Sequence, residues 1–138
     1  MNKVILVTGA AKRIGKQIAK EFFTIDFNII VHFNSSSEDA INLCNELNAI
    51  RPDSAISIQA NLDHINDVKN LASQAMSAFG RIDGLINNAS TFYPTPMGEF
   101  SEKDWDALMG SNLKAPLFLV QELHEELKRQ SGFVINVT

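Results

Sequence analysis

Residues 8–15, Thr-Gly-Ala-Ala-Lys-Arg-Ile-Gly, constrain the fold of this chain more than any other segment. They follow a short β-branched run at residues 3–7 that lacks alternation, which is typical of a strand buried on both faces. After them, apolar residues recur at helical spacing from Ile14 to Ile25, and residues 28–33 predict a second strand. The chain therefore begins with a strand–helix–strand unit, which places its two strands in a parallel sheet.

The same alternation continues along the rest of the 138 residues, a length that suits one compact domain. The patterns predict further strands at 55–59, 83–87 and 132–138, helices over 40–50 and 65–79, and a long helix before the last strand. Asp63 is the expected N-cap of the helix over 65–79, and Ser101 with Asp104 predicts a capping box for the long helix. We therefore expect an α/β fold, a doubly wound parallel (Rossmann) sheet of about five strands with helices on both faces.

The amino-acid composition limits the classes of partner that this domain can bind. Twelve Lys and Arg residues against sixteen Asp and Glu give a formal charge of −4, so there is no basic surplus for nucleic acid or an anionic membrane. The lone Cys44 and three scattered histidines show no metal-ligand spacing, and no apolar run reaches the roughly 18 residues of a membrane span. We expect a soluble, cytoplasmic protein that binds a small molecule and has no metal site.

Gly9 and Gly15 give the loop after the first strand its chemistry. Glycine lets the backbone approach a pyrophosphate closely, and the helix that follows offers free N–H groups and the positive end of its dipole. One alternative is a tight turn whose glycines serve packing alone. Another is the phosphate loop of ATP- and GTP-binding enzymes, but Gln17 stands where a Ser or Thr would hold magnesium. The pattern favours a dinucleotide.

Lys12 and Arg13 bring two cations to a loop beside the expected adenosine ribose, where the helix dipole does not favour them. A 2′-phosphate would add about two negative charges that both cations can bind. An NAD site usually has Asp or Glu at the end of the second strand, whereas residues 32–37 are uncharged and offer hydroxyl donors. The sequence favours NADP(H) as the cofactor. Alternatively, the cations are ordinary solvated charges, and Ser36 or Ser37 only caps the next helix.

These motifs resemble those of the short-chain dehydrogenase/reductase family. The family turn reads Thr-Gly-x-x-x-Gly-x-Gly, and Arg13 in place of the middle glycine is similar to the pteridine reductase branch, as is Asn-Asn-Ala-Ser at residues 87–90. The resemblance implies that His32 and Ser36 lie near the ribose phosphate and that Asn61 lies beside adenine. The cofactor-binding residues expected on this basis are Gly9, Lys12, Arg13, Ile14, Gly15, His32, Asn34, Ser35, Ser36, Asn61, Leu62, Asn88, Ala89 and Ser90.

The resemblance also implies a substrate site and a proton relay. Ser90 and Phe92 match positions that contact a stacked pterin, for which a phenyl ring is a suitable platform; the alternative is that Phe92 packs beneath its loop. Pro116 cannot donate to the carbonyl of Asn112, so the long helix contains a free acceptor or a mere kink there. In the family the counterpart of Asn112 is catalytic, because its carbonyl holds a water of the relay to the catalytic lysine.

Family chemistry needs a Tyr acid with a Lys four residues later, and Tyr93 is followed at that distance by Met97. We therefore interpret residues 1–138 as the dinucleotide-binding domain of a longer enzyme, incomplete at its C-terminus. The expected function is NADPH-dependent hydride transfer to a carbonyl or imine substrate, with a pteridine as the candidate. The alternatives are a 3-oxoacyl-carrier-protein-type reductase of the same family and a non-catalytic NADP-binding module.

Residues 117–120, Leu-Phe-Leu-Val, make the long helix apolar around much of its girth. A helix of this kind is normally buried against a partner helix or another subunit. We therefore expect the full protein to form a homo-oligomer.

Overall fold

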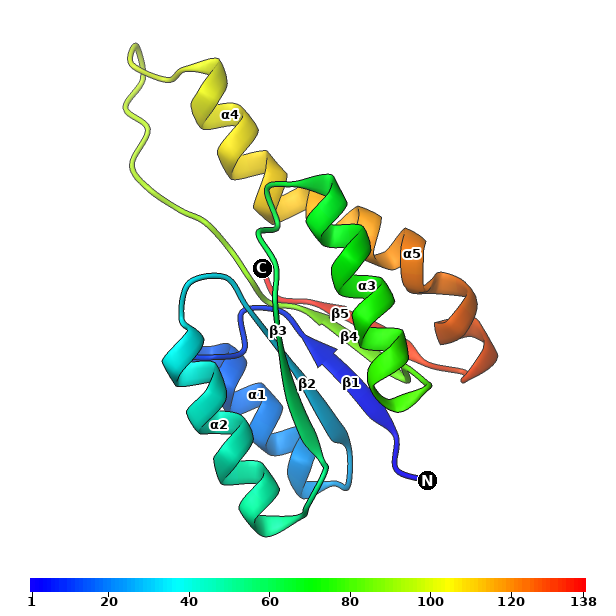
Figure 1. Ribbon diagram of the computed structural model, residues 1–138. Helices are drawn as coiled ribbons and strands as arrows, with labels where there is room; N and C mark the ends of the chain where they lie inside the picture. Colours follow the sequence, from blue (N-terminus) through cyan, green and yellow to red (C-terminus); the bar gives the residue numbers. More distant parts are fainter.

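The computed structural model describes residues 1–138 and contains one five-stranded sheet with helices on both faces (Figure 1). The elements are β1 (Val4–Val7), α1 (Arg13–Thr24), β2 (Asn28–Phe33), α2 (Ser37–Ile50), β3 (Ala55–Gln59), α3 (Ile65–Phe79), β4 (Gly84–Asn87), α4 (Glu102–Met109), the π-helical turn Gly110–Lys114, α5 (Ala115–Arg129) and β5 (Phe133–Asn136). No helix is both long and apolar enough to cross a lipid bilayer.

The strands lie in the order β3-β2-β1-β4-β5, and all neighbours are parallel. The chain builds outward from β1 to β3 and then returns to place β4 on the other side of β1. Ile5, for example, is in register with Ile29 of β2 and with Gly84 of β4. The winding direction reverses between β1 and β4, and open parallel sheets bind ligands at such a reversal, at the C-terminal ends of the strands.

Two apolar layers hold the helices to the sheet. Val4 and Leu6 of β1 point into the layer beneath α3 and α5, whereas Ile5 and Val7 point into the layer beneath α1 and α2. All four side chains have 0% exposure, which explains why the sequence of this strand lacks a polar alternation. Figure 1 shows the same division, with α1 and α2 on one face and α3 and α5 on the other.

The long helix expected before the last strand is divided into α4, a π-helical turn and α5. The predicted capping box is confirmed, because Ser101 Oγ accepts from the Asp104 N–H at 3.1 Å and Asp104 Oδ2 accepts from the Ser101 N–H at 2.9 Å. The Ala115 N–H donates to the carbonyl of Gly110, five residues earlier, and Pro116 follows in the first turn of α5. The turn widens just before the proline, where a missing N–H is tolerated.

The prediction that Asp63 caps α3 is wrong. The helix begins at Ile65 with His64 in the N-cap position, and no side chain accepts a capping hydrogen bond there. Asn61 takes over the turn, because its Oδ1 accepts from the Asp63 N–H at 3.0 Å while its own N–H donates to Asp67 Oδ2 at 2.9 Å. A local Asn turn therefore competes successfully with the capping geometry.

Candidate functional site

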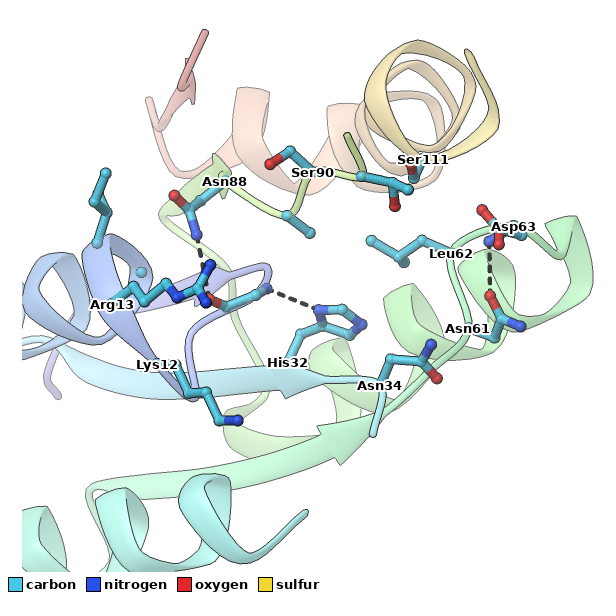
Figure 2. A pocket seen from close by; sticks show the side chains of 15 residues that line it. Lys12, Arg13, His32, Asn34, Asn61, Leu62, Asp63, Asn88, Ser90 and Ser111 are labelled. Carbon is cyan, nitrogen blue, oxygen red and sulfur yellow. Dashed lines mark hydrogen bonds between the residues drawn. The ribbon is translucent and has the colours of Figure 1, made fainter. Parts of the chain in front are cut away.

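A cleft of about 510 Å³ opens at the C-terminal ends of the strands, above the reversal between β1 and β4 (Figure 2). It brings together every predicted cofactor-binding residue except Ser35 and Ser36. The lining consists of Gly9, Lys12, Arg13, Ile14, Gly15, His32, Asn34, Asn61, Leu62, Asp63, Asn88, Ala89, Ser90, Thr91 and Ser111. Asp63, Thr91 and Ser111 were not predicted from the sequence.

The glycine turn between β1 and α1 forms the floor of the cleft through close backbone packing. Gly9 has φ +60°, a left-handed conformation that favours glycine, and a Cβ there would lie 3.0 Å from Ala89 Cα. A Cβ on Gly15 would lie 2.2 Å from the Gly9 carbonyl oxygen and 2.5 Å from Asn88 Nδ2. Both glycines are therefore required sterically, and they leave a backbone surface that a pyrophosphate can approach.

Arg13 has a left-handed backbone, with φ 53°, at the first position of α1. A non-glycine residue in this conformation costs on the order of 1–2 kcal/mol. Such strain is common at ligand sites. No acidic residue lies in the first turn of α1, and the N-cap residue Lys12 makes no side-chain capping bond. The helix end therefore presents uncapped N–H groups together with two cations, an arrangement that suits an anionic ligand.

His32, near the end of β2, lines the cleft and supports the glycine turn. Its Nδ1 accepts from the Gly9 N–H at 3.0 Å (Figure 2). Its Nε2–H donates to the Ala60 carbonyl at 2.9 Å. The side chain is only 2% exposed, and burial lowers the pKa of its imidazole below the ordinary 6.5, opposed by the hydrogen bond to Ala60. Both ring nitrogens are engaged, so His32 has a positioning role for the turn. Its predicted place near the ribose phosphate stays a prediction.

Thr8 links the turn to the end of β4, and sequence reasoning missed it. Its Oγ1 accepts from the N–H groups of Asn88 and Ala89, both at 2.9 Å. Asn88 Nδ2 returns two hydrogen bonds, to the carbonyl of Thr8 at 3.1 Å and to that of Gly9 at 3.2 Å. The position of Thr8 directly before the first glycine is the only sequence signal for this role. The network holds two loops that are 80 residues apart in a fixed relation.

The loop between β2 and α2 borders the adenosine side expected for the cleft. Gln59 Nε2 donates to Asn34 Oδ1 at 3.0 Å, which orients the Asn34 side chain. Ser36 is the N-cap residue of α2, but its side chain makes no capping hydrogen bond. The hydroxyl of Ser36 is therefore not used for capping, contrary to the alternative interpretation of this serine. Lys12 Nζ lies 3.3 Å from Asp39 Oδ2 in the first turn of α2.

A second hollow of about 830 Å³ adjoins the cleft between the ends of β4 and β5 and the π-helical turn. Its lining is more apolar and includes Leu113, Pro116 and Val120, and it shares Ser90 with the first cleft. Asn87 also lines it, and the buried Oδ1 of this residue accepts no hydrogen bond, while its Nδ2 donates to Asn136 Oδ1 at 2.9 Å. This hollow has the size and lining of a small-molecule site.

Asn112 lies in the π-helical turn and lines the second hollow. Its Nδ2 donates to the Thr91 carbonyl at 2.7 Å and its Oδ1 accepts from the Thr91 N–H at 3.0 Å. The predicted role of its backbone carbonyl in a proton relay stays a prediction. The structure adds that its side chain fastens the loop after β4, a contact that no sequence pattern indicated.

Phe92 extends from that loop and is 87% exposed, so the alternative that it packs beneath the loop is wrong. It lines neither hollow. The neighbouring Tyr93 donates its hydroxyl proton to Asp104 Oδ1 at 2.9 Å, and this hydrogen bond raises the pKa of Tyr93. The loop is therefore anchored to α4 through Tyr93 while Phe92 stays available for a contact.

Comparison with known protein families supports the assignment made from the fold and the glycine turn. The family model for short chain dehydrogenases matches residues 3–138. The chain belongs to the short-chain dehydrogenase family, as the motifs predicted. The fold class is likewise confirmed.

Particular relatives include enzymes with different substrates. The 3-oxoacyl-acyl-carrier-protein reductase of Staphylococcus epidermidis is 34% identical over 139 aligned positions, which cover 100% of this chain and 57% of that protein. Pteridine reductase 1 of Leishmania tarentolae is 36% identical over 149 positions, covering 86% of this chain and 52% of the relative. The chain thus spans about half the length of these curated relatives.

Among solved structures, the chain is similar to a blue fluorescent protein from a metagenomic library, crystallised in complex with NADPH. The TM-score is 0.92 with 31% sequence identity, and the match covers 97% of this chain and 54% of the other. The strands and helices of this chain are therefore arranged as in a protein that was crystallised with NADPH.

Proposed function

We propose that the chain is the cofactor-binding domain of an NADPH-dependent oxidoreductase that reduces a carbonyl or imine substrate. The observation that carries this proposal is the uncapped start of α1, where Lys12 and the left-handed Arg13 line a cleft above the strand reversal. An anionic ligand accounts for both the cations and the strained backbone. NADPH supplies the hydride when it is bound.

The residues present fit this cofactor. Gly9 and the first turn of α1 face the expected pyrophosphate, and a Cβ at Gly9 would press against Ala89 and disturb the turn. Lys12 borders the loop after β2, which carries no carboxylate before Glu38 and is thus suited to a 2′-phosphate. Asn61 borders the end expected for adenine. Ser90 lies where the cleft meets the second hollow, which is the place expected for the nicotinamide and substrate.

Removal of the two cations tests the cofactor. We expect Lys12→Ala with Arg13→Ala to weaken NADPH binding to the full protein about tenfold or more, with a much smaller effect on NADH, because a charge-assisted contact contributes roughly 1.5–3 kcal/mol. Titration of both nucleotides by fluorescence measures this. Lys69→Ala with Lys128→Ala is the matched control, since it removes two exposed cations elsewhere. Equal weakening of NADPH and NADH would contradict the cofactor assignment.

For the substrate we propose a pteridine ring stacked on Phe92. The exposed phenyl ring lies two residues after Ser90, which lines the second hollow, in a loop anchored by Tyr93 and Asn112. Similarity to pteridine reductase 1 supports the same class. The second candidate is a 3-oxoacyl thioester, which the 34% identity to a 3-oxoacyl-acyl-carrier-protein reductase over the whole chain favours equally.

Steady-state assays separate the two substrate classes. If the pteridine proposal is right, the full protein reduces a dihydropterin, and Phe92→Ala raises its KM about fivefold, because an aromatic stack contributes on the order of 1 kcal/mol. Met97→Ala, also in this loop and 98% exposed, is the control and should change little. Turnover of 3-oxoacyl substrates with no reaction of pterins would assign the second candidate instead.

We further propose that residues 1–138 belong to a longer chain that supplies the Tyr-x-x-x-Lys pair and that the full protein is a homo-oligomer. The share of the relatives that is covered supports the first part, and the exposure of Leu113 and Leu117 on the π-turn and α5 supports the second. Intact mass of the gene product and light scattering test both parts. A mass of 15.3 kDa would leave only a non-catalytic NADP-binding module.

A further inference from the structure

We propose that Asp39 sets the limit of discrimination between NADPH and NADH, because it competes with the 2′-phosphate for the ammonium group of Lys12. The inference rests on the proposed function of the cleft. Its basis is the ion pair between Lys12 Nζ and Asp39 Oδ2, at 3.3 Å, on the cleft side of α1 and α2. Lys12 thus has an anionic partner within the protein at the place where a ligand phosphate is expected.

The geometry places this carboxylate beside the expected phosphate. Lys12 is the N-cap residue of α1 and lines the cleft, and Asp39 lies in the first turn of α2, directly after the loop that contains Ser36. In Figure 2 the Lys12 side chain lies on the β2 side of the cleft, on the same side as Asn34 and away from Asn88. An anion held by Lys12 and this loop would therefore lie close to Asp39.

The ion pair between Lys12 and Asp39 is exposed to solvent, so Lys12 can leave Asp39 for another anion. The side chains of Lys12 and Asp39 are 57% and 49% exposed, so their attraction is weak and screened by salt. A phosphate with about two negative charges attracts the ammonium more strongly than one carboxylate does, and the flexible lysine stem lets Lys12 turn toward it. Asp39 then remains a like charge near the phosphate and opposes its binding. The charged residues next to this pair in the sequence are Arg13 and Glu38.

The two helices do not depend on this pair for their contact. A second ion pair, Lys20 Nζ to Glu46 Oε1 at 2.6 Å, joins α1 and α2 farther from the cleft. Ala19 and Leu43, both almost fully buried, pack in the layer beneath these helices. Loss of the Asp39 charge should therefore leave the fold intact and act on the ligand alone.

The test compares Asp39→Asn with Glu46→Gln in the full protein. Each variant removes one negative charge from α2 and breaks one ion pair to α1, but only the first lies at the cleft. We expect Asp39→Asn to tighten NADPH about two- to fivefold and to leave NADH unchanged, as for the loss of one exposed charge interaction. Glu46→Gln should change neither affinity. The gain should shrink at about 1 M salt, where the Debye length is about 3 Å.

Two results would overturn the inference. Weaker NADPH binding by Asp39→Asn would mean that the carboxylate positions Lys12 productively, and equal changes for NADPH and NADH would mean that it does not sense the 2′-phosphate. The same substitution in a Lys12→Ala background should give a smaller gain, whereas an unchanged gain would exclude competition through Lys12. Failure of the proposed function is distinct, because the unaltered protein would then show no preference for NADPH.

Discussion

The sheet differs on the two sides of its centre. The strands β1 and β2 and the start of β3 are buried, and α1 and α2 close one face over them. On the other side, β5 carries Val134 and Ile135 at 37% and 45% exposure, and α4 has no buried residue at all. In Figure 1 α4 and the loop before it extend away from the sheet.

The two sides of the sheet support their loops in different ways. The buried side fixes the glycine turn tightly, because a Cβ added at Gly15 would lie only 2.2 Å from the Gly9 carbonyl oxygen. The open side carries the loop of Ser90 and Phe92, which is held by hydrogen bonds from Thr91 to Asn112 of the π-helical turn and from Tyr93 to Asp104 of α4. A nucleotide site needs the first kind of support, whereas a substrate loop that moves needs the second.

Truncation of buried and exposed side chains on α2 and α5 should give the largest difference between the two sides of the sheet. Leu43 of α2 and Leu119 of α5 are at most 1% exposed, and we expect each change to Ala to lower the free energy of unfolding by about 3 kcal/mol. Ile50 of α2 is 70% exposed and should lose less than about 0.5 kcal/mol. Leu117 of α5 is 61% exposed, yet it should lose more than Ile50 in the full protein, because we propose that this face is covered there. Denaturant unfolding measures all four.

Equal small losses for Leu117 and Ile50 would show that the outer face of α5 stays open. That outcome would remove the support that this face gives to a homo-oligomer, while the assignment of the inner face would stand on Leu119.

A methyl group added at two glycines compares the fixed turn with the loose loop. Gly15→Ala should destabilise the protein by about 2–3 kcal/mol and abolish nucleotide binding, because the new Cβ meets backbone atoms that cannot move. Gly98→Ala has open space but φ +93°, so it should cost about 1 kcal/mol by strain alone and leave binding intact. Thermal unfolding and NADPH titration check both. Retained binding in Gly15→Ala would mean that the turn is less rigid than described.

The pH dependence of stability tests the support for the turn from His32. Burial lowers the pKa of His32 in the folded protein below 6.5, so the unfolded chain binds more protons below that value. The contribution of His32 is therefore complete above pH 6.5 and is lost as the pH falls through the folded-state pKa. His32→Leu should cost about 1–3 kcal/mol at pH 7.5, because Gly9 N–H and the Ala60 carbonyl lose their partner, and should reduce the pH dependence between 7.5 and 5. An unchanged pH profile would contradict this role.

Much of the site was predictable because its signals are local. The apolar run at residues 3–7 and the periodicity after Ile14 predicted β1 and α1, and the glycines between them predicted the turn. Ser101 and Asp104 predicted their own capping box, since both partners lie within one turn of helix. The same local reasoning failed at Asp63, where a neighbouring Asn offered the backbone a competing hydrogen bond.

Other features depend on neighbours that the local pattern does not reveal. The left-handed backbone of Arg13, the two partners of His32 and the bond of Asn112 to Thr91 each require knowledge of which loop lies beside which. The π-helical turn is a similar case: Pro116 predicted a disturbance, but the local pattern did not show that it takes the form of a π-helical turn over Gly110–Lys114.

The alternation of strands and helices, the family, and the set of loops that carry polar and glycine residues were all predictable from the amino-acid sequence. Those properties follow from periodicity and local backbone preferences, which act over a few residues. Three contacts became visible only in the folded chain: Thr8 with Asn88, His32 with Gly9, and Lys12 with Asp39. Thr8 and Asn88 are 80 positions apart in the sequence, and Gly9 and His32 are 23 positions apart. They meet because the strand order β3-β2-β1-β4-β5 brings the C-terminal ends of these strands together.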